Sequence, residues 1–205
     1  MELLINIYSL DHFFTHSWQN ISTSFKAICF YLFMKFTMNP ARAYLLGLWK
    51  GRRTKEGVGV EGHREVCEAF LKTCLDEKLA EPDKVKYLEG PVHKCYFYHS
   101  ALRAWLDEEM EKRGDRFRFK NEFAASYFAG LFDGKGGFAA SGDGDIPYIV
   151  GDEVDEMVLL RLGFRAKKEG SKIGIVSEDF YGWIMPYLRL EISKKKGGKT
   201  VTLSK

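Results

Sequence analysis

The sequence contains one internal repeat, and a duplicated chain is expected to fold into two similar units. Residues 43–51 (AYLLGLWKG) and 126–134 (SYFAGLFDG) share a tyrosine, two glycines, a leucine and an aromatic residue at a constant spacing of 83 residues. Residues 98–106 resemble residues 176–184 more weakly, with a spacing of 78 residues. The smaller second spacing indicates that the second unit is shorter in one loop.

The two units are expected at residues 38–118 and 119–205, with the same order of helices and strands in each. The expected elements of the first and second unit are an apolar helix (41–51; 121–134), strands (57–62; 136–150), an amphipathic helix (66–74; 154–161), strands (84–98; 164–177) and a closing helix (100–113; 178–191). Apolar residues at helical or alternating spacing support these assignments. The order αββαββα, present twice, predicts an α+β fold in which each half has an antiparallel sheet with helices on one face.

Glycines repeat on one face of the first helix of each unit. Gly47 and Gly51 are one helical turn apart, and Gly130 and Gly134 occupy the matching positions. Glycine costs about 1 kcal/mol in a helix interior, so four glycines at matching positions need a reason. Helices that lack Cβ atoms on their facing sides can pack backbone to backbone, which predicts that these helices form the interface between the repeats. The alternative is that Gly51 and Gly134 only end their helices.

Composition bears on several classes of protein. Residues 38–205 contain no glutamine and only two asparagines, with abundant lysine and glutamate, which is the pattern of heat-adapted proteins. The four cysteines form no CxxC pair, so neither a disulfide framework nor a tetrahedral zinc site is expected. The net charge of +3 neither requires nor excludes a nucleic-acid partner. These features predict a folded cytoplasmic protein.

Residues 1–37 differ from the rest of the chain. Only four of them are charged and nine are aromatic, and the apolar run at 27–34 is too short to span a bilayer. A basic start and a small-residue cleavage site, which a signal peptide needs, are both missing. We interpret residues 1–37 as an upstream extension that is not native, with Met38 as the start, and we expect no membrane contact. Asn39 is then the N-cap of a helix that begins with Pro40.

Residues 127–138 (YFAGLFDGKGGF) resemble the second signature of a LAGLIDADG homing endonuclease, and residues 45–54 (LLGLWKGRRT) resemble a degenerate first signature. The resemblance covers residues 38–205, and the spacing of the two signatures and their shared order of elements support it. It implies a single-chain, monomeric protein with internal pseudo-twofold symmetry. The signature helices would form the interface between the halves, and the two sheets would form a saddle in a DNA major groove.

The sequence departs from this family at the two positions of the catalytic acids. In the family, the eighth residue of each signature is an acid, and the two acids bind the divalent metals that activate water. Here these positions hold Arg52 and Lys135, and cations do not ligate Mg²⁺. The resemblance therefore implies a degenerate member that has no metal cofactor and has lost endonuclease activity.

Other acids would be needed for a metal site, and Mg²⁺ is expected only if they form one. Asp133 lies two residues before Lys135, but its counterpart in the first signature is Lys50, so no pair of acids is recovered. The remaining candidates lie further on, in strands or turns: Glu56, Glu61, Asp143 and Asp145.

Arg52 and Lys135 are instead expected to bind a nucleic-acid phosphate. Two cations close together repel each other unless an anion lies between them, and phosphate contacts add affinity that salt removes. The alternative is that both side chains point into solvent or pair with Asp133, Glu56 or Glu169. Further candidates for nucleic-acid binding are Arg53, Lys55, Lys94, Tyr96, Arg165, Lys167, Lys168 and Lys172. The acidic stretches at 107–111 and 152–156 are interpreted as helix surface that faces away from the nucleic acid.

The sequence thus predicts a catalytically inactive nucleic-acid-binding protein with a LAGLIDADG fold. Its partner would be DNA, for a regulator of transcription, or RNA, for a maturase-like factor. One alternative is an active metal-dependent homing endonuclease that uses non-standard acids to cleave double-stranded DNA. A third is a protein-interaction module that kept the fold and lost nucleic-acid binding, which the weak net charge leaves open.

Overall fold

The computed structural model describes residues 36–141, 144–191 and 193–194. The chain divides between Thr37 and Met38, and every described helix and strand lies in the part that begins at Met38. None of the described helices combines the length and the apolar character that crossing a membrane requires. The interpretation of residues 1–35, the candidate Asp143 and most of the basic tail (Lys195, Lys196 and Lys199) lie outside the described residues.

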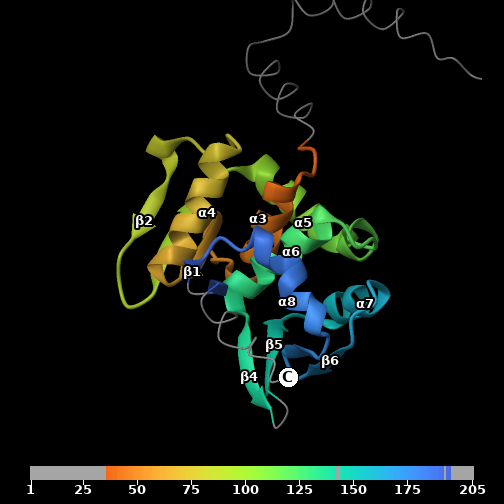
Figure 1. Cartoon of the computed structure of the whole chain (residues 1–205). Helices are drawn as coiled ribbons and strands as arrows, with labels where there is room; N and C mark the ends of the chain where they lie inside the picture. Colours follow the sequence, from red (N-terminus) through yellow and green to blue (C-terminus); the bar gives the residue numbers. More distant parts are fainter. Residues whose placement is uncertain (1–35, 142–143, 192, 195–205) are drawn as a thin grey trace, which may run out of the picture. The chain divides into compact units, whose positions relative to one another are not determined.

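The first half follows the expected order of elements with one strand fewer (Figure 1). Its elements are α3 (Pro40–Arg52), β1 (Val58–Gly62), α4 (Arg64–Asp76), the short 3₁₀ helix η2 (Pro82–Lys84), β2 (Lys86–Leu88), β3 (His93–Phe97) and α5 (Ser100–Arg116). The strands form an antiparallel sheet in the order β1-β3-β2. Because so few residues separate α3 from α4, the chain has room for one strand there, and Arg53 forms an isolated bridge to Val60.

The second half keeps all the expected strands. Its elements are α6 (Glu122–Lys135), β4 (Gly137–Ser141), β5 (Gly144–Val150), α7 (Glu153–Arg161), β6 (Ala166–Glu169), β7 (Lys172–Ile175), α8 (Glu178–Ile184) and the 3₁₀ helix η3 (Met185–Tyr187). The strands form an antiparallel sheet in the order β4-β5-β7-β6. The closing helix is shorter than the expected 178–191, because Pro186 lacks the N–H that would continue an α-helix.

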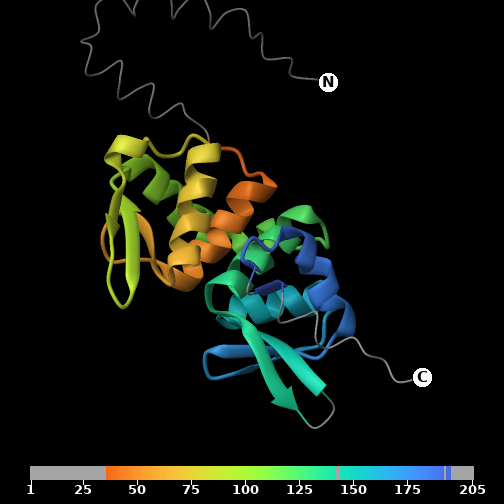
Figure 2. The same cartoon turned by 60° about the vertical axis from the view of Figure 1, so that its left-hand side comes forward.

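Each sheet buries one face against the helices of its own half, and Figure 2 shows those helices to one side of each sheet. In the first half the buried strand residues are Val58, Val60, Cys95 and Phe97, which pack with Phe70 and its neighbours on α4. In the second half they are Ile149, Ile173 and Ile175, and α7 adds Val158 and Leu159. Side chains alternate along a strand, so the opposite face of each sheet is left open. The protein is therefore an α+β protein with two antiparallel sheets.

The two halves meet through α3 and α6, which make the most extensive contact between any two described elements. Both helices begin in the same way, because the side chain of Asn39 accepts a hydrogen bond from Arg42 N, and that of Asn121 accepts one from Ala124 N. The N-cap expected at Asn39 is confirmed. The equivalent cap at Asn121 shows that the repeat extends to the first turn of each helix.

Glycines bring the backbones of α3 and α6 together. A Cβ atom added at Gly47 would lie 2.1 Å from the carbonyl oxygen of Tyr127, and one added at Gly130 would lie 2.1 Å from the carbonyl oxygen of Tyr44. Neither position can therefore hold a larger residue without separating the helices. Gly51 and Gly134 face each other one turn later, with 3.6 Å between an added Cβ atom and the opposite Cα atom. Both lie inside their helices, which end at Arg52 and Lys135.

Candidate nucleic-acid interface

The close contact of α3 and α6 places their last turns side by side, with Arg52 on one helix and Lys135 on the other. The guanidinium Nε of Arg52 donates a hydrogen bond to the carbonyl oxygen of Gly134 at 2.6 Å, across the interface between the halves. Partial burial lowers the pKa of Arg52, although an arginine still carries its charge at neutral pH. Lys135 is exposed, and none of the described carboxylates lies within ion-pairing distance of it.

A hollow of about 740 Å³ lies at these helix ends and is lined by residues from both halves. Its basic lining residues are Arg52, His63, Arg64, His93, Lys135 and Lys172. The acids that line it are Glu65 and Asp133. Basic groups thus outnumber acids in a concave site, and such a site concentrates anions.

Asp133 is committed to the interior. It is 5% exposed, and its Oδ2 atom accepts hydrogen bonds from Tyr44 Oη at 2.8 Å and from the backbone N–H groups of Arg189 and Leu190 at 2.8 and 3.2 Å. Burial raises the pKa of Asp133, and these hydrogen bonds oppose that rise. The carboxylate therefore joins α3 of one half to the segment after η3 of the other.

The other candidate acids are not gathered near the helix ends. Glu56 and Glu61 pair with Lys94 on the first sheet, at 3.9 and 3.3 Å. Asp145 is exposed on β5, opposite Ala140. Among the described residues, no group of three or more His, Cys, Asp or Glu side chains is placed to hold a metal ion.

Two of the candidates for nucleic-acid binding lie on the open face of the first sheet. Lys94 is partly neutralised there by Glu56 and Glu61. Tyr96 is only 9% exposed, because it lies over Gly59, where an added Cβ atom would be 2.4 Å from Tyr96 Cβ. The sheet therefore offers less of these two side chains than strand alternation alone predicts.

The second sheet separates its lysines onto two faces. Lys167 and Lys172 are exposed and line the open face. Lys168 lies opposite the buried Ile173, on the face that α7 covers, and its ammonium pairs with Glu153 at 2.8 Å. Lys168 is thus misplaced in the predicted interface, since the alternation of β6 directs it toward the helix. Outside the sheet strands, Arg53, Lys55 and Arg165 are exposed.

Comparison of the sequence with protein-family models and with curated proteins gives no match. Comparison of the fold with solved structures finds the homing endonuclease I-DmoI. A structure of mesophilic variants of I-DmoI has a TM-score of 0.53 and 15% sequence identity, and the match covers 73% of this chain and 95% of that chain. I-DmoI in complex with DNA and Mn has a TM-score of 0.51 and 14% identity, covering 74% of this chain and 98% of that chain.

This chain has the LAGLIDADG homing-endonuclease fold. The signature helices of that fold are α3 and α6, and the hollow lies where both end.

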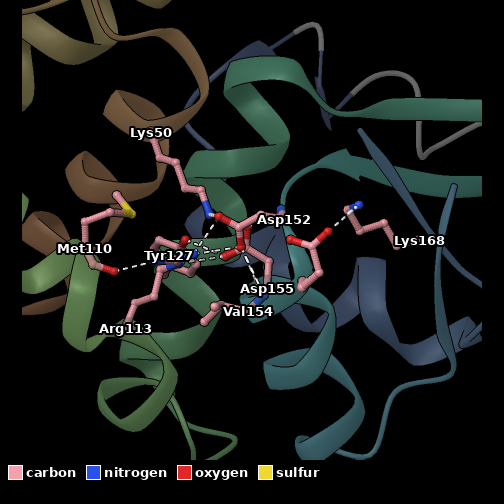
Figure 3. Close-up of polar contacts among 9 residues, drawn as sticks. Lys50, Met110, Arg113, Tyr127, Asp152, Val154, Asp155 and Lys168 are labelled. Carbon is pink, nitrogen blue, oxygen red and sulfur yellow. Dashed lines mark hydrogen bonds and ion pairs between the residues drawn. The ribbon is translucent and has the colours of Figure 1, made fainter. Parts of the chain in front are cut away.

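A buried charge network ties the two halves of this LAGLIDADG fold together beside the signature helices (Figure 3). It consists of Lys50 on α3, Arg113 on α5, Tyr127 on α6, and Asp152 and Asp155 at the start of α7. Asp155 is fully buried and accepts hydrogen bonds from Lys50, Arg113 and Tyr127. Asp152 binds both Lys50 and Arg113. Two cations thus face two carboxylates, and the network carries no net charge.

The network replaces a symmetric contact that the repeat would otherwise supply. Tyr44 donates its hydroxyl proton to Asp133, whereas the matching Tyr127 cannot donate to Lys50, which stands at the position matching Asp133. Asp155 supplies the missing carboxylate, and the ammonium of Lys50 binds that same carboxylate. Burial raises the pKa of both tyrosines, so both stay neutral hydrogen-bond donors.

The assignment of residues 152–156 to a free helix surface is therefore wrong for Asp152 and Asp155. Asp152 is the N-cap of α7, and the two aspartates form a reciprocal capping box. Burial alone would raise the pKa of Asp152, but the ion pairs to Lys50 and Arg113 hold it well below its usual value. The spacing of two acids three residues apart before an apolar helix is the signal that would have identified the cap. Their cationic partners lie far away in sequence and leave no such signal.

Proposed function

We propose that this protein binds nucleic acid through its LAGLIDADG fold and does not cleave DNA with a divalent metal. The observation that carries the proposal is the pair Arg52 and Lys135 at the ends of the signature helices, inside a hollow lined mainly by basic groups. The titles of several I-DmoI structures name DNA together with Ca, Mn or Mg. In this chain the equivalent region favours an anion, which a phosphate of the nucleic acid would supply.

The open faces of the two sheets extend this site. Lys94 on the first sheet and Lys167 and Lys172 on the second are directed away from the helices. Phosphate contacts position a nucleic acid, whereas contacts to base edges select its sequence. We therefore assign the positioning role to Arg52 and Lys135 and the selecting role to the sheets. The biological role that follows is that of a regulator bound to DNA or a maturase-like factor bound to RNA, acting as a monomer.

Replacing both Arg52 and Lys135 with alanine is expected to weaken binding about equally for preferred and random target sequences. The slope of log K against log salt concentration should fall by about 1–2, because each lost phosphate contact removes about 0.9 on duplex DNA and about 0.7 on single strands. Fluorescence anisotropy titrations at several salt concentrations measure both quantities. Lys135→Ala alone changes an exposed side chain, and it should lower the slope by about half as much.

The matched control removes the same two charges elsewhere. Lys72 on α4 and Lys112 on α5 are exposed, and both lie on helices rather than on an open sheet face. The double variant Lys72→Ala with Lys112→Ala should leave the slope unchanged. Equal slopes for the two double variants and the unmodified protein would place Arg52 and Lys135 outside the binding site.

The protein is also expected not to nick or cut a supercoiled plasmid library in the presence of Mg²⁺ or Mn²⁺. Two-metal hydrolysis needs carboxylates that bind the ions, and Asp133 is already hydrogen-bonded within the interior. Gel analysis of plasmid forms gives the result. Metal-dependent cleavage that disappears in Asp145→Ala or Asp133→Asn would instead establish the alternative, an endonuclease with non-standard acids.

A further inference from the structure

One aromatic side chain on the open face of the first sheet is unusually accessible. Tyr98 is 67% exposed, the largest exposed fraction of any large hydrophobic residue in the described part of the chain. It directly follows β3, and it lies on the same face as Tyr96, since the intervening Phe97 is buried in the core. The ring is thus presented on the face that the helices leave open.

Neighbouring residues hold this ring in place. The edge of one tyrosine meets the other, with 5.8 Å between the ring centroids of Tyr96 and Tyr98. The ammonium of Lys86 lies 5.2 Å from the centroid of Tyr98 and 5.8 Å from that of Tyr96. Gly57 contributes a close backbone approach, because an added Cβ atom there would lie 3.3 Å from Tyr98 Cδ1. A ring fixed in this way loses little conformational freedom when a ligand binds.

The chemistry of this arrangement suits an unpaired nucleobase. Aromatic side chains stack on the exposed face of an unpaired base, and a cation beside the ring can bind the neighbouring phosphate. In an intact duplex both faces of each base are covered by its neighbours, so the ring could stack only after unstacking the helix. We infer that Tyr98 and Lys86 form a stacking site for an unpaired base, such as a bulged or looped nucleotide. This inference rests on the proposed nucleic-acid binding.

The test compares three RNA ligands of equal length: a perfect duplex, the same duplex with one bulged adenosine, and the same duplex with an abasic bulge. By fluorescence anisotropy, the unmodified protein should bind the bulged adenosine at least about fivefold more tightly than the other two. Tyr98→Ala should remove this preference, and Tyr98→Phe should retain it. A 2-aminopurine at the bulge should change its fluorescence on binding only when the ring is present. A DNA set with the same bulge distinguishes RNA from DNA as the source of the base.

Phe119 provides the matched control. It is 61% exposed, and the guanidinium of Arg118 lies 4.8 Å from its ring centroid, but it lies outside both sheets. Phe119→Ala should not alter the preference for the bulged ligand. Equal binding of bulged and perfect duplexes by the unmodified protein, or equal weakening of both by Tyr98→Ala, would overturn the stacking site and leave nucleic-acid binding intact. Failure of the unmodified protein to bind any of the nucleic acids would overturn both proposals.

Discussion

Replacing Gly47 with alanine is expected to destabilise the protein by about 3 kcal/mol or more, at or beyond the upper end of the usual cost of overpacking a core. The added methyl group would lie 2.1 Å from the carbonyl oxygen of Tyr127 and 2.9 Å from the amide nitrogen of Leu131. Both atoms belong to the backbone of α6, so no side-chain rotation relieves the clash and the helices must separate. Gly130→Ala should behave alike, since its added Cβ atom meets the backbone at Tyr44 and Leu48. Urea denaturation measures the change.

Gly51→Ala is the matched control, one turn further along the same face of the same helix. Its added Cβ atom would lie 3.6 Å from Gly134 Cα, which is an ordinary van der Waals distance. Alanine also favours a helix interior over glycine by about 1 kcal/mol, so this variant should be as stable as the unmodified protein or slightly more stable. If Gly47→Ala and Gly51→Ala had the same effect, the close contact of α3 and α6 would not govern stability.

Much of this fold could be predicted from the sequence, because its strongest signals are local and repeated. The constant spacing between Tyr44 and Tyr127 and between the paired glycines identified the two signature helices. The missing strand of the first half was harder to predict. Glycine-rich extended sequence indicates strand without giving the number of strands, and the single bridge from Arg53 to Val60 depends on how the chain turns after α3.

The site was less predictable, because burial and pairing depend on residues far apart in sequence. The basic side chains at the helix ends followed from the motif, but the histidines that join them in the hollow, His63 and His93, did not. Strand alternation could have excluded Lys168, since it shares a face with Ala166 and lies opposite Ile173. No local pattern marks Lys86 as the partner of Tyr98, because β2 and β3 must first pair in the observed register.

The buried charge network leads to the second large effect, which is expected for Asp155→Ala. Asp155 has no exposed surface, and its carboxylate is the meeting point of Lys50, Arg113 and Tyr127. Removing it leaves two largely buried cations with Asp152 as their shared carboxylate. Breaking a buried ion pair by removing one partner typically costs about 3–5 kcal/mol, and we expect a loss of unfolding free energy in that range. Asp107→Ala, which breaks an exposed pair with Arg103, should change it by less than about 1 kcal/mol.

Restoring the charge balance should recover part of this loss. Asp155→Asn keeps an acceptor for the Tyr127 hydroxyl but removes the charge that Lys50 and Arg113 share. Adding Lys50→Met removes one cation and leaves Arg113 opposite Asp152, whose two carboxylate oxygens it already binds. The double variant should therefore be more stable than the sum of the two single changes predicts, by about 0.5–3 kcal/mol in a double-mutant cycle. Strict additivity would mean that Lys50 and Asp155 are close in space without stabilising each other, and the lysine at this signature position would then need another explanation.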